Sequence, residues 1–370
     1  MHLQVLQEKL SKATSTALRF TSTKAQLPIL ANLLFKTQKN KLIVNATNLE
    51  LSISIAVGAQ ITKEGEIAVP AKVVSDIINN LPKQSIELEV EKEQLKILTE
   101  GFSGTVSAMN SSDFPGVPLA LSKNSFEIPT KEFTDSLSKL LFAVSTDEAR
   151  PTICGVLFIF KKGELELVAT DGFRLSRKTV VVKDLPESGR VIIPKAILSE
   201  VVRLSGAGES ISLSYLKEDN QVVFGVSDVV VSSRTIEGDF PPFEKIIPKS
   251  SEFKVEVGKE ELLRGVKLAS PFAREAANVL ALGFKGGGVE VSAESKVVGN
   301  QKSTVDARID GDIPKGLKIA FNYRFMEEAI NAIEGESVGM EFIGANNPGV
   351  FRDPGDKDYL HLIMPVKVQD

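Results

Sequence analysis

The pattern of apolar and polar positions repeats along the chain. A short apolar strand that runs into a helix start appears at 65–81, again at 189–204, and in a looser form at 316–333. Pro70 and Pro194 stand at the junction in the first two copies, where proline is tolerated because its missing N–H would have no partner in the first helical turn. Each copy therefore predicts a strand followed by an amphipathic helix.

Two further motifs repeat with the same spacing. Asp113-Phe114-Pro115 returns as 239–241, and Ala46-Thr47-Asn48 returns as 169–171, so the copies are offset by about 125 residues. Such regularity indicates three copies of one domain. Short polar connectors near 122–124 and 249–251 place the domains at 1–121, 125–248 and 252–370.

Each copy predicts the order helix, strands, helix, strands. The six expected helices cover 6–18, 71–81, 131–144, 195–204, 259–269 and 323–333. Strands are expected at 42–45, 49–57, 66–69, 85–90, 94–99, 105–109, 155–160, 165–169, 176–182, 210–215, 221–226, 229–234, from 279 onward and at 337–343, and a last strand covers 358–367. The alternating segments between them follow one another like hairpins, with no steady β-α-β order. The predicted fold class is therefore α+β, with two helices of each domain packed on antiparallel sheets.

The composition is that of a soluble globular protein. Of the 370 residues, 42% are hydrophobic and 25% charged, and the net charge is −4. The single Cys154 excludes an internal disulfide, and its apolar neighbours predict a buried side chain. A basic leader and an apolar run of membrane-spanning length are both missing, which predicts a cytoplasmic protein without a membrane partner.

Residues that could carry catalysis are scarce. The two histidines, His2 and His361, lie near opposite ends of the chain, which makes a catalytic triad or a histidine-based metal site improbable. The glycines at 286–288 lack the spacing of a phosphate-binding loop and predict a turn. We therefore expect no enzyme activity, no metal and no cofactor.

Cations recur on the predicted helices. A solvated face explains each helix taken alone, but repetition on one scaffold favours a common basic surface that contacts phosphates without reading bases. The helical cations placed on this surface are Lys9, Lys12, Lys72, Lys139, Lys195, Arg203, Arg264 and Lys267.

Several motifs, in order, resemble the family of bacterial sliding clamps, the beta subunits of DNA polymerase III. They are 27–32 (LPILAN), 169–175 (ATDGFRL), 236–241 (IEGDFP) and 362–365 (LIMP), and the similarity runs over essentially the whole chain. The resemblance implies a non-catalytic ring of two chains, joined head to tail, whose helices surround duplex DNA. It also implies a clamp loader, the replicative polymerase alpha subunit and other clamp-motif proteins as partners.

Two alternatives remain beside this interpretation. One is a repeat scaffold that binds only proteins and does not encircle DNA. The other is an enzyme that uses scattered carboxylates, against which the missing histidine, cysteine and phosphate-loop signals count.

The resemblance also implies particular site residues. A partner-peptide pocket would comprise Ile153, Thr170, Gly172, Phe173, Arg174, Leu175, Pro241, Lys245, Ile246, Leu362, Met364, Pro365, Val366 and Lys367. Loop residues Lys24 and Arg150 would face DNA, and Thr105, Val106 and Phe272 would lie at the dimer interface.

The chain departs from the family pattern at a few of these positions. Phe173 stands where the family commonly has histidine, and Lys245 and Lys367 stand where arginine is frequent. The chain also continues through 368–370, past the usual end, which could partly cover the pocket mouth.

Overall fold

The computed structural model describes residues 1–22, 27–117, 121–122, 125–183, 185, 188–206 and 208–367. Its contacts divide the chain into two compact units, Met1–Lys131 with Ala196–Thr235, and Glu132–Lys195 with Ile236–Asp370. The expectations for Lys24 and for the extension 368–370 lie outside the described residues. No helix in the described part of the chain combines the length and apolar character needed to cross a bilayer.

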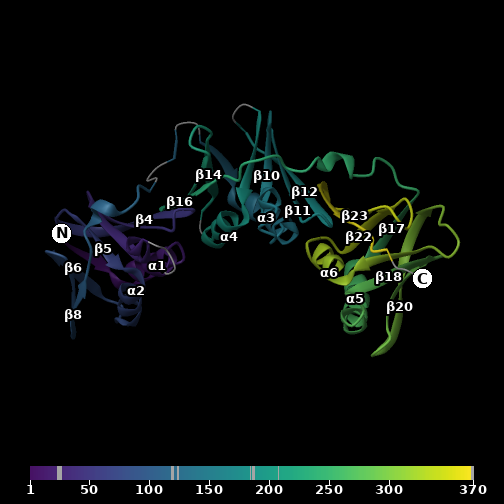
Figure 1. Cartoon of the computed structure of the whole chain (residues 1–370), viewed down its shortest axis with the longest axis horizontal. Helices are drawn as coiled ribbons and strands as arrows, with labels where there is room; N and C mark the ends of the chain where they lie inside the picture. Colours follow the sequence, from purple (N-terminus) through teal and green to yellow (C-terminus); the bar gives the residue numbers. More distant parts are fainter. Residues whose placement is uncertain are drawn as a thin grey trace. The chain divides into compact units, whose positions relative to one another are not determined.

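The first unit is built on a 12-stranded sheet of described residues, antiparallel throughout, with the order β8-β7-β6-β1-β4-β16-β15-β14-β9 and with β2, β3 and β5 joined through β4 (Figure 1). Helix α1 (Gln7–Leu18) packs on α2 (Ala71–Asn80) and on strands of this sheet. The strands are β1 (His2–Leu6), β2 (Asn32–Gln38), β3 (Lys41–Thr47), β4 (Leu51–Lys63), β5 (Glu66–Pro70), β6 (Ser85–Glu91), β7 (Gln94–Thr99), β8 (Phe102–Ser107), β9 (Phe126–Pro129), β14 (Ser210–Leu216), β15 (Gln221–Val226) and β16 (Val229–Arg234).

The second unit has a 12-stranded antiparallel sheet of described residues in the order β13-β10-β11-β12-β24-β23-β22-β17-β20-β19-β18-β21. Helix α5 (Lys259–Arg274) packs on α6 (Tyr323–Asn331) and on β17–β20 (Figure 1). The strands are β10 (Gly155–Lys161), β11 (Glu164–Thr170), β12 (Arg174–Val181), β13 (Gly189–Pro194), β17 (Phe253–Gly258), β18 (Val279–Lys285), β19 (Gly288–Ser295), β20 (Gly299–Gly311), β21 (Lys318–Asn322), β22 (Ser337–Phe342), β23 (Gly349–Asp353) and β24 (Asp356–Ile363).

Helices α3 (Thr130–Ser138) and α4 (Lys195–Leu204) begin close to the points where the chain passes between the units. Five 3-10 turns complete the described elements: η1 (Pro28–Ala31), η2 (Ser111–Asp113), η3 (Leu141–Ala143), η4 (Pro151–Ile153) and η5 (Phe243–Lys245).

Strand pairing joins each sequence repeat to the next. The last strand of the second repeat, β16, pairs with β4 of the first, with Val229 opposite Ile55. The last strand of the third repeat, β24, pairs with β12 of the second, with Ile363 opposite Arg174. Because β4 and β12 follow the matching motifs at 46–48 and 169–171, these two junctions are equivalent. The sheets therefore continue through the repeat boundaries, and the two compact units share the central repeat between them.

The α+β class with antiparallel sheets is confirmed. Several predicted bounds were wrong. The helix expected at 131–144 ends at Ser138 and is followed by η3, while α5 continues past 269 to Arg274 with Pro271 inside it. The last strand ends at Ile363 instead of 367. Strands β1, β2, β9, β17 and β23 were missed, and β1, β9 and β17 directly precede a helix, whose apolar spacing conceals theirs.

Phenylalanine supplies the aromatic packing of the second unit. The rings of Phe253, Phe284 and Phe342 lie with centroids 5.0–5.3 Å apart, and Phe321 and Phe351 extend the cluster. Aromatic pairs at such separations add stabilisation beyond the area they bury.

Gly155 begins β10 opposite Pro194, and a Cβ there would lie 2.5 Å from the carbonyl oxygen of Ile193. We expect Gly155→Ala to lower the free energy of unfolding by about 2 kcal/mol, because the backbone of β13 must move. The measurement is urea unfolding followed by circular dichroism. Gly58→Ala is the matched control, since the space around that strand glycine is open. Equal unfolding midpoints for the two variants would contradict the close approach.

Candidate functional site

A cavity of about 530 Å³ opens in the second unit where the β11–β12 turn, η4, η5 and the end of β24 meet. Nine residues expected in the pocket line it: Ile153, Thr170, Gly172, Arg174, Leu175, Pro241, Ile246, Leu362 and Met364. Six more were not expected there: Ala149, Arg150, Pro151, Thr152, Pro242 and Phe243. The walls are mainly apolar, so the cavity suits a ligand whose apolar surface is exposed to water when it is free and becomes buried when it binds.

The β11–β12 turn is fixed by its own polar side chains. The hydroxyl of Thr170 donates to the carbonyl of Arg174 at 2.6 Å, and Asp171 Oδ1 accepts from the backbone N–H groups of Phe173 and Arg174 at 2.9 and 3.0 Å. Gly172 has φ +92°, a backbone conformation that costs an L side chain energy. The Thr-Asp-Gly sequence is therefore explained by the turn itself.

The first repeat makes the same turn with a different residue. Leu49 stands where the second repeat has Gly172 and adopts φ 76°. Asn48 Oδ1 accepts from the backbone N–H groups of Glu50 and Leu51 at 3.1 and 2.8 Å, as Asp171 does in its turn. The second repeat thus differs by leaving the turn backbone uncovered at the cavity.

Arg174 joins the turn to other parts of the unit. Its side chain is 8% exposed, and its guanidinium donates to Asp171 Oδ2 at 3.0 Å, to the Phe142 carbonyl at 2.6 Å, and to Glu328 on α6. The same group lies 4.3 Å from the ring centroid of Phe325. Each guanidinium nitrogen thus has a protein acceptor. The guanidinium therefore holds the turn against α6 and η3, and Arg174, which was expected in the pocket, also lines the cavity.

Glu328, Phe142 and Phe325 were missed as functional residues. Glu328 is 154 positions from Arg174 in the sequence and belongs to no local motif with it. Only the fold brings α6 against the turn, so the sequence carries no signal for this contact.

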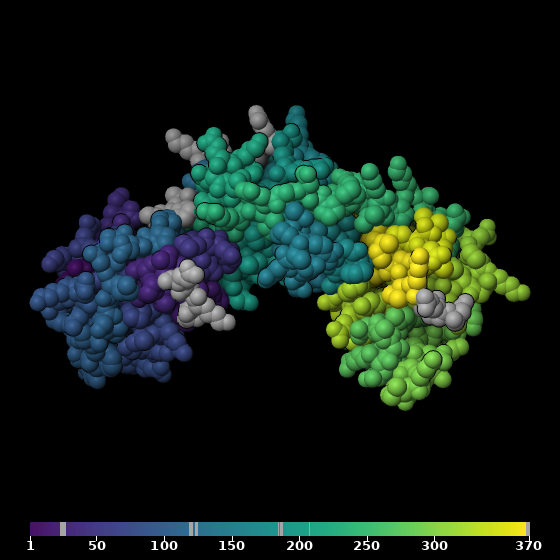
Figure 2. All heavy atoms as spheres, in the orientation of Figure 1, coloured from purple at the N-terminus to yellow at the C-terminus, as the bar shows by residue number. Residues whose placement is uncertain are grey.

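The C-terminal segment forms one side of the cavity and then leaves it. Met364 N–H donates to the Phe173 carbonyl at 2.9 Å, and Val366 N–H donates to the Ala320 carbonyl of β21 at 2.8 Å. Figure 2 shows this segment, in yellow, at the surface of the second unit. Five residues expected in the pocket do not line the cavity in the described structure: Phe173, Lys245, Pro365, Val366 and Lys367.

His361 and Ser176 form a buried pair beside this wall, with 2.6 Å between the hydroxyl and Nδ1. Complete burial, followed by the nearby charge of Arg174, lowers the pKa of His361 to about 3. The ring is therefore neutral at ordinary pH, and its burial keeps it from any ligand in the cavity. Its role is to satisfy the polar group of a core serine.

An ion-pair network around the buried Lys139, which directly follows α3, reaches the β23–β24 hairpin. Lys139 Nζ lies 2.9 Å from Asp356 and 3.2 Å from Glu334, and Lys178 Nζ lies 2.6 Å from Asp356. Burial acts against the charged forms, but the ion pairs outweigh it, so the pKa of Asp356 is lowered and that of Lys139 is raised. The expectation that Lys139 faces DNA is corrected: its side chain is buried, and its ammonium group is paired with carboxylates of the same chain.

The other expected DNA-facing cations occupy varied surroundings. Lys9, Lys12 and Lys72 are exposed on α1 and α2, and Arg264 and Lys267 are exposed on α5. Arg203 pairs with Glu200 at 3.0 Å, and Lys195 is half-buried at the start of α4. Arg150, a loop residue expected to face DNA, is exposed, lines the cavity and pairs with Asp147 at 2.8 Å.

The expected dimer residues lie on two elements. Thr105 is exposed and Val106 is buried in β8, which ends the sheet of the first unit, and Phe272 is partly buried on α5.

The prediction that Cys154 is buried was wrong. The residue is partly exposed, and its thiol donates to the Asp147 carbonyl at 3.2 Å. Partial burial, followed by the nearby negative charges of Asp147 and Glu148, raises the pKa of this thiol.

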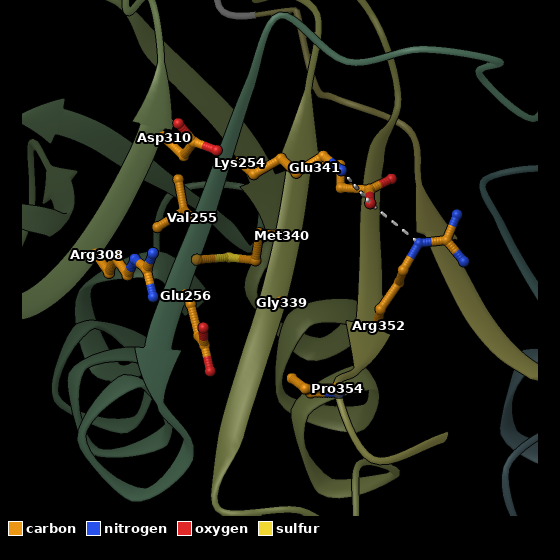
Figure 3. Close-up of a pocket in the computed structure, with 10 residues that line it drawn as sticks. All are labelled: Lys254, Val255, Glu256, Arg308, Asp310, Gly339, Met340, Glu341, Arg352 and Pro354. Atoms are coloured by element: carbon orange, nitrogen blue, oxygen red, sulfur yellow. Dashed lines mark ion pairs between the residues drawn. The ribbon is translucent and has the colours of Figure 1, made fainter. Parts of the chain in front are cut away.

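A second hollow, of about 220 Å³, lies on the sheet face formed by β17, β20, β22 and β23 (Figure 3). Glu341 there forms ion pairs with Lys254 at 3.8 Å and with Arg352 at 3.2 Å. The charges are of both signs and partly neutralise one another. The arrangement is that of a solvated sheet face, and the apolar cavity remains the better candidate.

Comparison with solved structures identifies the class. The chain superposes on a DNA polymerase sliding clamp from Bacillus subtilis with a TM-score of 0.94 and 26% sequence identity, covering 100% of both chains. The fold is therefore that of the sliding clamps, with three clamp-fold domains.

Sequence comparison identifies the family. A beta sliding clamp of Staphylococcus epidermidis is 30% identical over 362 residues, and one of Staphylococcus aureus is 29% identical over 361, each with 95% of both chains covered. Models of the N-terminal, central and C-terminal domains of the DNA polymerase III beta subunit match residues 1–118, 127–242 and 244–367. The chain belongs to the DNA polymerase III beta subunit family, and it is a sliding clamp of DNA replication.

The Asp356 network predicts a pH dependence. Because the folded-state pKa of Asp356 lies below its ordinary value of 3.8, its contribution to stability is complete above that pH and is lost as the pH falls through the folded value. The raised pKa of Lys139 acts at the other limit, so its contribution is lost only as the pH rises beyond 10.5.

We expect Asp356→Asn to lower the free energy of unfolding by about 3 kcal/mol at pH 7, because two lysines lose their shared partner. The difference from wild type should shrink below about pH 4. Urea unfolding between pH 3 and pH 8 is the measurement, with Asp358→Asn on the exposed side of the hairpin as control. A constant difference across this range would contradict the account.

Proposed function

We propose that two copies of this chain join head to tail into a ring around duplex DNA in the cytoplasm. A clamp loader places the ring on DNA, and the apolar cavity tethers the replicative polymerase alpha subunit and other clamp-motif proteins. The chain contributes no catalytic group of its own. The proposed domain bounds 1–121, 125–248 and 252–370 define the six similar segments of such a ring.

The observation that carries the proposal is an incomplete pattern of strand addition. In two junctions, the last strand of one repeat extends the sheet of the repeat before it. The strands that receive this addition are β4 and β12, and their counterpart in the third repeat is β20. One edge of β20 pairs with β17 along 307–311, but the same edge has no partner strand along 299–306 in the described chain. The last strand of the first repeat, β8, pairs with β7 alone among the described strands. Within this pattern of strand addition, the described strands leave one donor edge, that of β8, and one acceptor edge, on β20; β5, β9, β13 and β21 also pair with a single described strand, but they are not last strands of a repeat.

A second copy supplies both missing partners. The β8 edge of each chain fits the open edge of β20 in the other, and such a heterologous contact closes into a ring when its rotation permits. The scaffold alternative, in which the chain binds only proteins, explains the cavity but leaves these two edges without a purpose.

The existing junctions predict the register. Ser232, the fourth residue of β16, lies opposite Ser52 of β4. Thr105 is the fourth residue of β8, whose hairpin with β7 matches the β15–β16 hairpin. Thr105 therefore takes the role of Ser232 in the closing contact.

The acceptor position follows from the second junction. Leu175 lies opposite Thr170 in β11 and opposite Leu362 of the last strand, just as Ser52 lies opposite Thr47 and Ser232. Glu294 lies as far beyond the start of β18 as Thr170 lies beyond the start of β10, and it pairs with Asn300. We therefore place Thr105 opposite Asn300 of the partner subunit.

Exposed apolar residues near both edges support the same contact. Val297 and Val298, at the β19–β20 turn, are 81% and 50% exposed. Arg19 at the end of α1 pairs with Glu200 of α4 at 2.8 Å, so a first helix meets the second helix of the next repeat. By the same rule Phe272 on α5 would meet Val73 on α2 of the partner subunit, burying an apolar side chain that is 49% exposed in the single chain.

The register is tested by cysteine pairing in a Cys154→Ser background. Thr105→Cys with Asn300→Cys should give a covalent dimer on oxidation, because opposed residues of antiparallel strands lie within disulfide distance. The measurement is non-reducing gel electrophoresis. Thr105→Cys with Thr304→Cys, four residues out of register, is the control and should remain a single chain. A ladder of longer polymers, or no cross-link, would contradict closure by two copies.

The cavity is proposed to bind short apolar segments of partner proteins. Leu362 and Met364 present apolar surface to it, and burying a Leu or Phe side chain contributes about 1.5–3 kcal/mol. Gly172 is exposed, with Arg150 Nη1 3.1 Å from the position that a Cβ would take, and the Arg174 cluster holds its backbone in place.

We expect Glu328→Gln to weaken a labelled Leu- and Phe-containing peptide about tenfold, although Glu328 does not line the cavity. The reason is that Arg174 loses its charged partner on α6 and the cavity wall loosens. Met364→Ala should weaken binding directly. Fluorescence anisotropy measures both, and Glu327→Gln, one position away on α6, is the control. Unchanged affinity in a folded Glu328→Gln protein would refute the positioning role.

A further inference from the structure

The helix pair α3 and α6 differs in charge from the other helices. Helix α3 carries Lys131 against Glu132 and Asp135, and α6 carries Arg324 against Glu327 and Glu328. Each helix thus has one more acidic than basic residue. A groove of about 340 Å³ between them is lined by Asp135, Glu328, Glu334 and Asn331, among others.

Lys139 also lines this groove, and its charge is paired there with that of Glu334. Lys139 is 6% exposed, and its ammonium group is held by Asp356 and Glu334 with the ring of Tyr359 5.5 Å away. Its positive charge is balanced within the network and adds little to the potential outside.

Helices α1 and α5 have the opposite character. Lys9 and Lys12 lie one turn apart on α1, and Arg264 and Lys267 lie one turn apart on α5, all exposed. No ion pair to these four side chains occurs among the described residues. Cations in this state gain most from a phosphate, because nothing within the chain competes for them.

We infer that the basic lining of the clamp is interrupted at α3 and α6, so that the phosphates of encircled DNA are contacted from α1 and α5 and not from this helix pair. The inference rests on the proposed encirclement. Carboxylates repel phosphates over a screening length of about 8 Å at physiological ionic strength, so the acidic pair holds the duplex away from itself.

The acidic groove between α3 and α6 lies next to the apolar cavity, because the two are joined through Arg174. Phe142 and Glu328 line the acidic groove and also hold Arg174, which lines the apolar cavity. A protein bound in the cavity therefore sits beside the part of the wall that holds DNA least.

The test compares two double variants that remove the same number of cations from the full-length protein. Binding to a labelled duplex is measured by anisotropy between 50 and 200 mM salt. Lys9→Gln with Lys12→Gln should lower the slope of log affinity against log salt by roughly 1 to 2, since each phosphate contact contributes about 0.9. Lys131→Gln with Arg324→Gln, on the acidic pair, should change it by less than about 0.5.

Equal losses of slope in the two variants would overturn the interruption while leaving encirclement intact. The double variant Asp135→Asn, Glu327→Gln gives an independent check. It should bind DNA more tightly, because it removes two negative charges without adding a cation. Unchanged or weaker binding to DNA would count against the inference. A wild-type protein that is not retained on circular duplex DNA after treatment with a clamp loader would overturn the proposed function itself, and this inference with it. Sedimentation of each variant confirms that the dimer is preserved.

Discussion

The structure depends on one constraint: the open edge of a β-sheet must find a partner. Backbone N–H and C=O groups along an edge strand bind another strand if one is offered, so exposed edges are liabilities unless they are paired by design. In this chain β16 covers the edge of β4 and β24 covers the edge of β12. Repeating the same solution turns three similar domains into continuous sheets.

The cavity is a consequence of such a junction. Where β24 joins β12, the chain end, the β11–β12 turn and η5 are brought together, although they are far apart in the sequence. The equivalent turn at the first junction carries Leu49 in place of Gly172. The repeated backbone therefore sets the geometry of both junctions, and a few side chains determine which of them can receive a ligand.

Local patterns predicted the parts of the fold that local interactions determine. Strands β7, β15 and β16 and helix α4 fall where alternation and helical spacing place them, because each is bounded by turn residues or proline. The repeated motifs also located the cavity turn, since Thr170 and Asp171 form it with their own side chains. Strands such as β1 and β17 were concealed because they lead directly into helices without a turn between them.

What local patterns missed was set by distant partners. Lys139 has the helical position of a surface cation, but Asp356, 217 residues away, pairs with it in the interior. Arg174 has the appearance of a ligand-binding residue, but α6 and η3 occupy its donors. A charged side chain reveals its type in the sequence, whereas its partner is determined only when the sheets have brought the two elements together.

The central claim is that two chains close into a ring by the strand-pairing rule that already joins the repeats within one chain. The most direct measurement is retention of the Thr105→Cys, Asn300→Cys protein on nicked circular DNA, oxidised after a clamp loader has placed it there and washed at 1 M salt. The account predicts that the closed ring stays on the circle and is released when the circle is cut. Release from the intact circle, or equal retention on linear DNA, would contradict it.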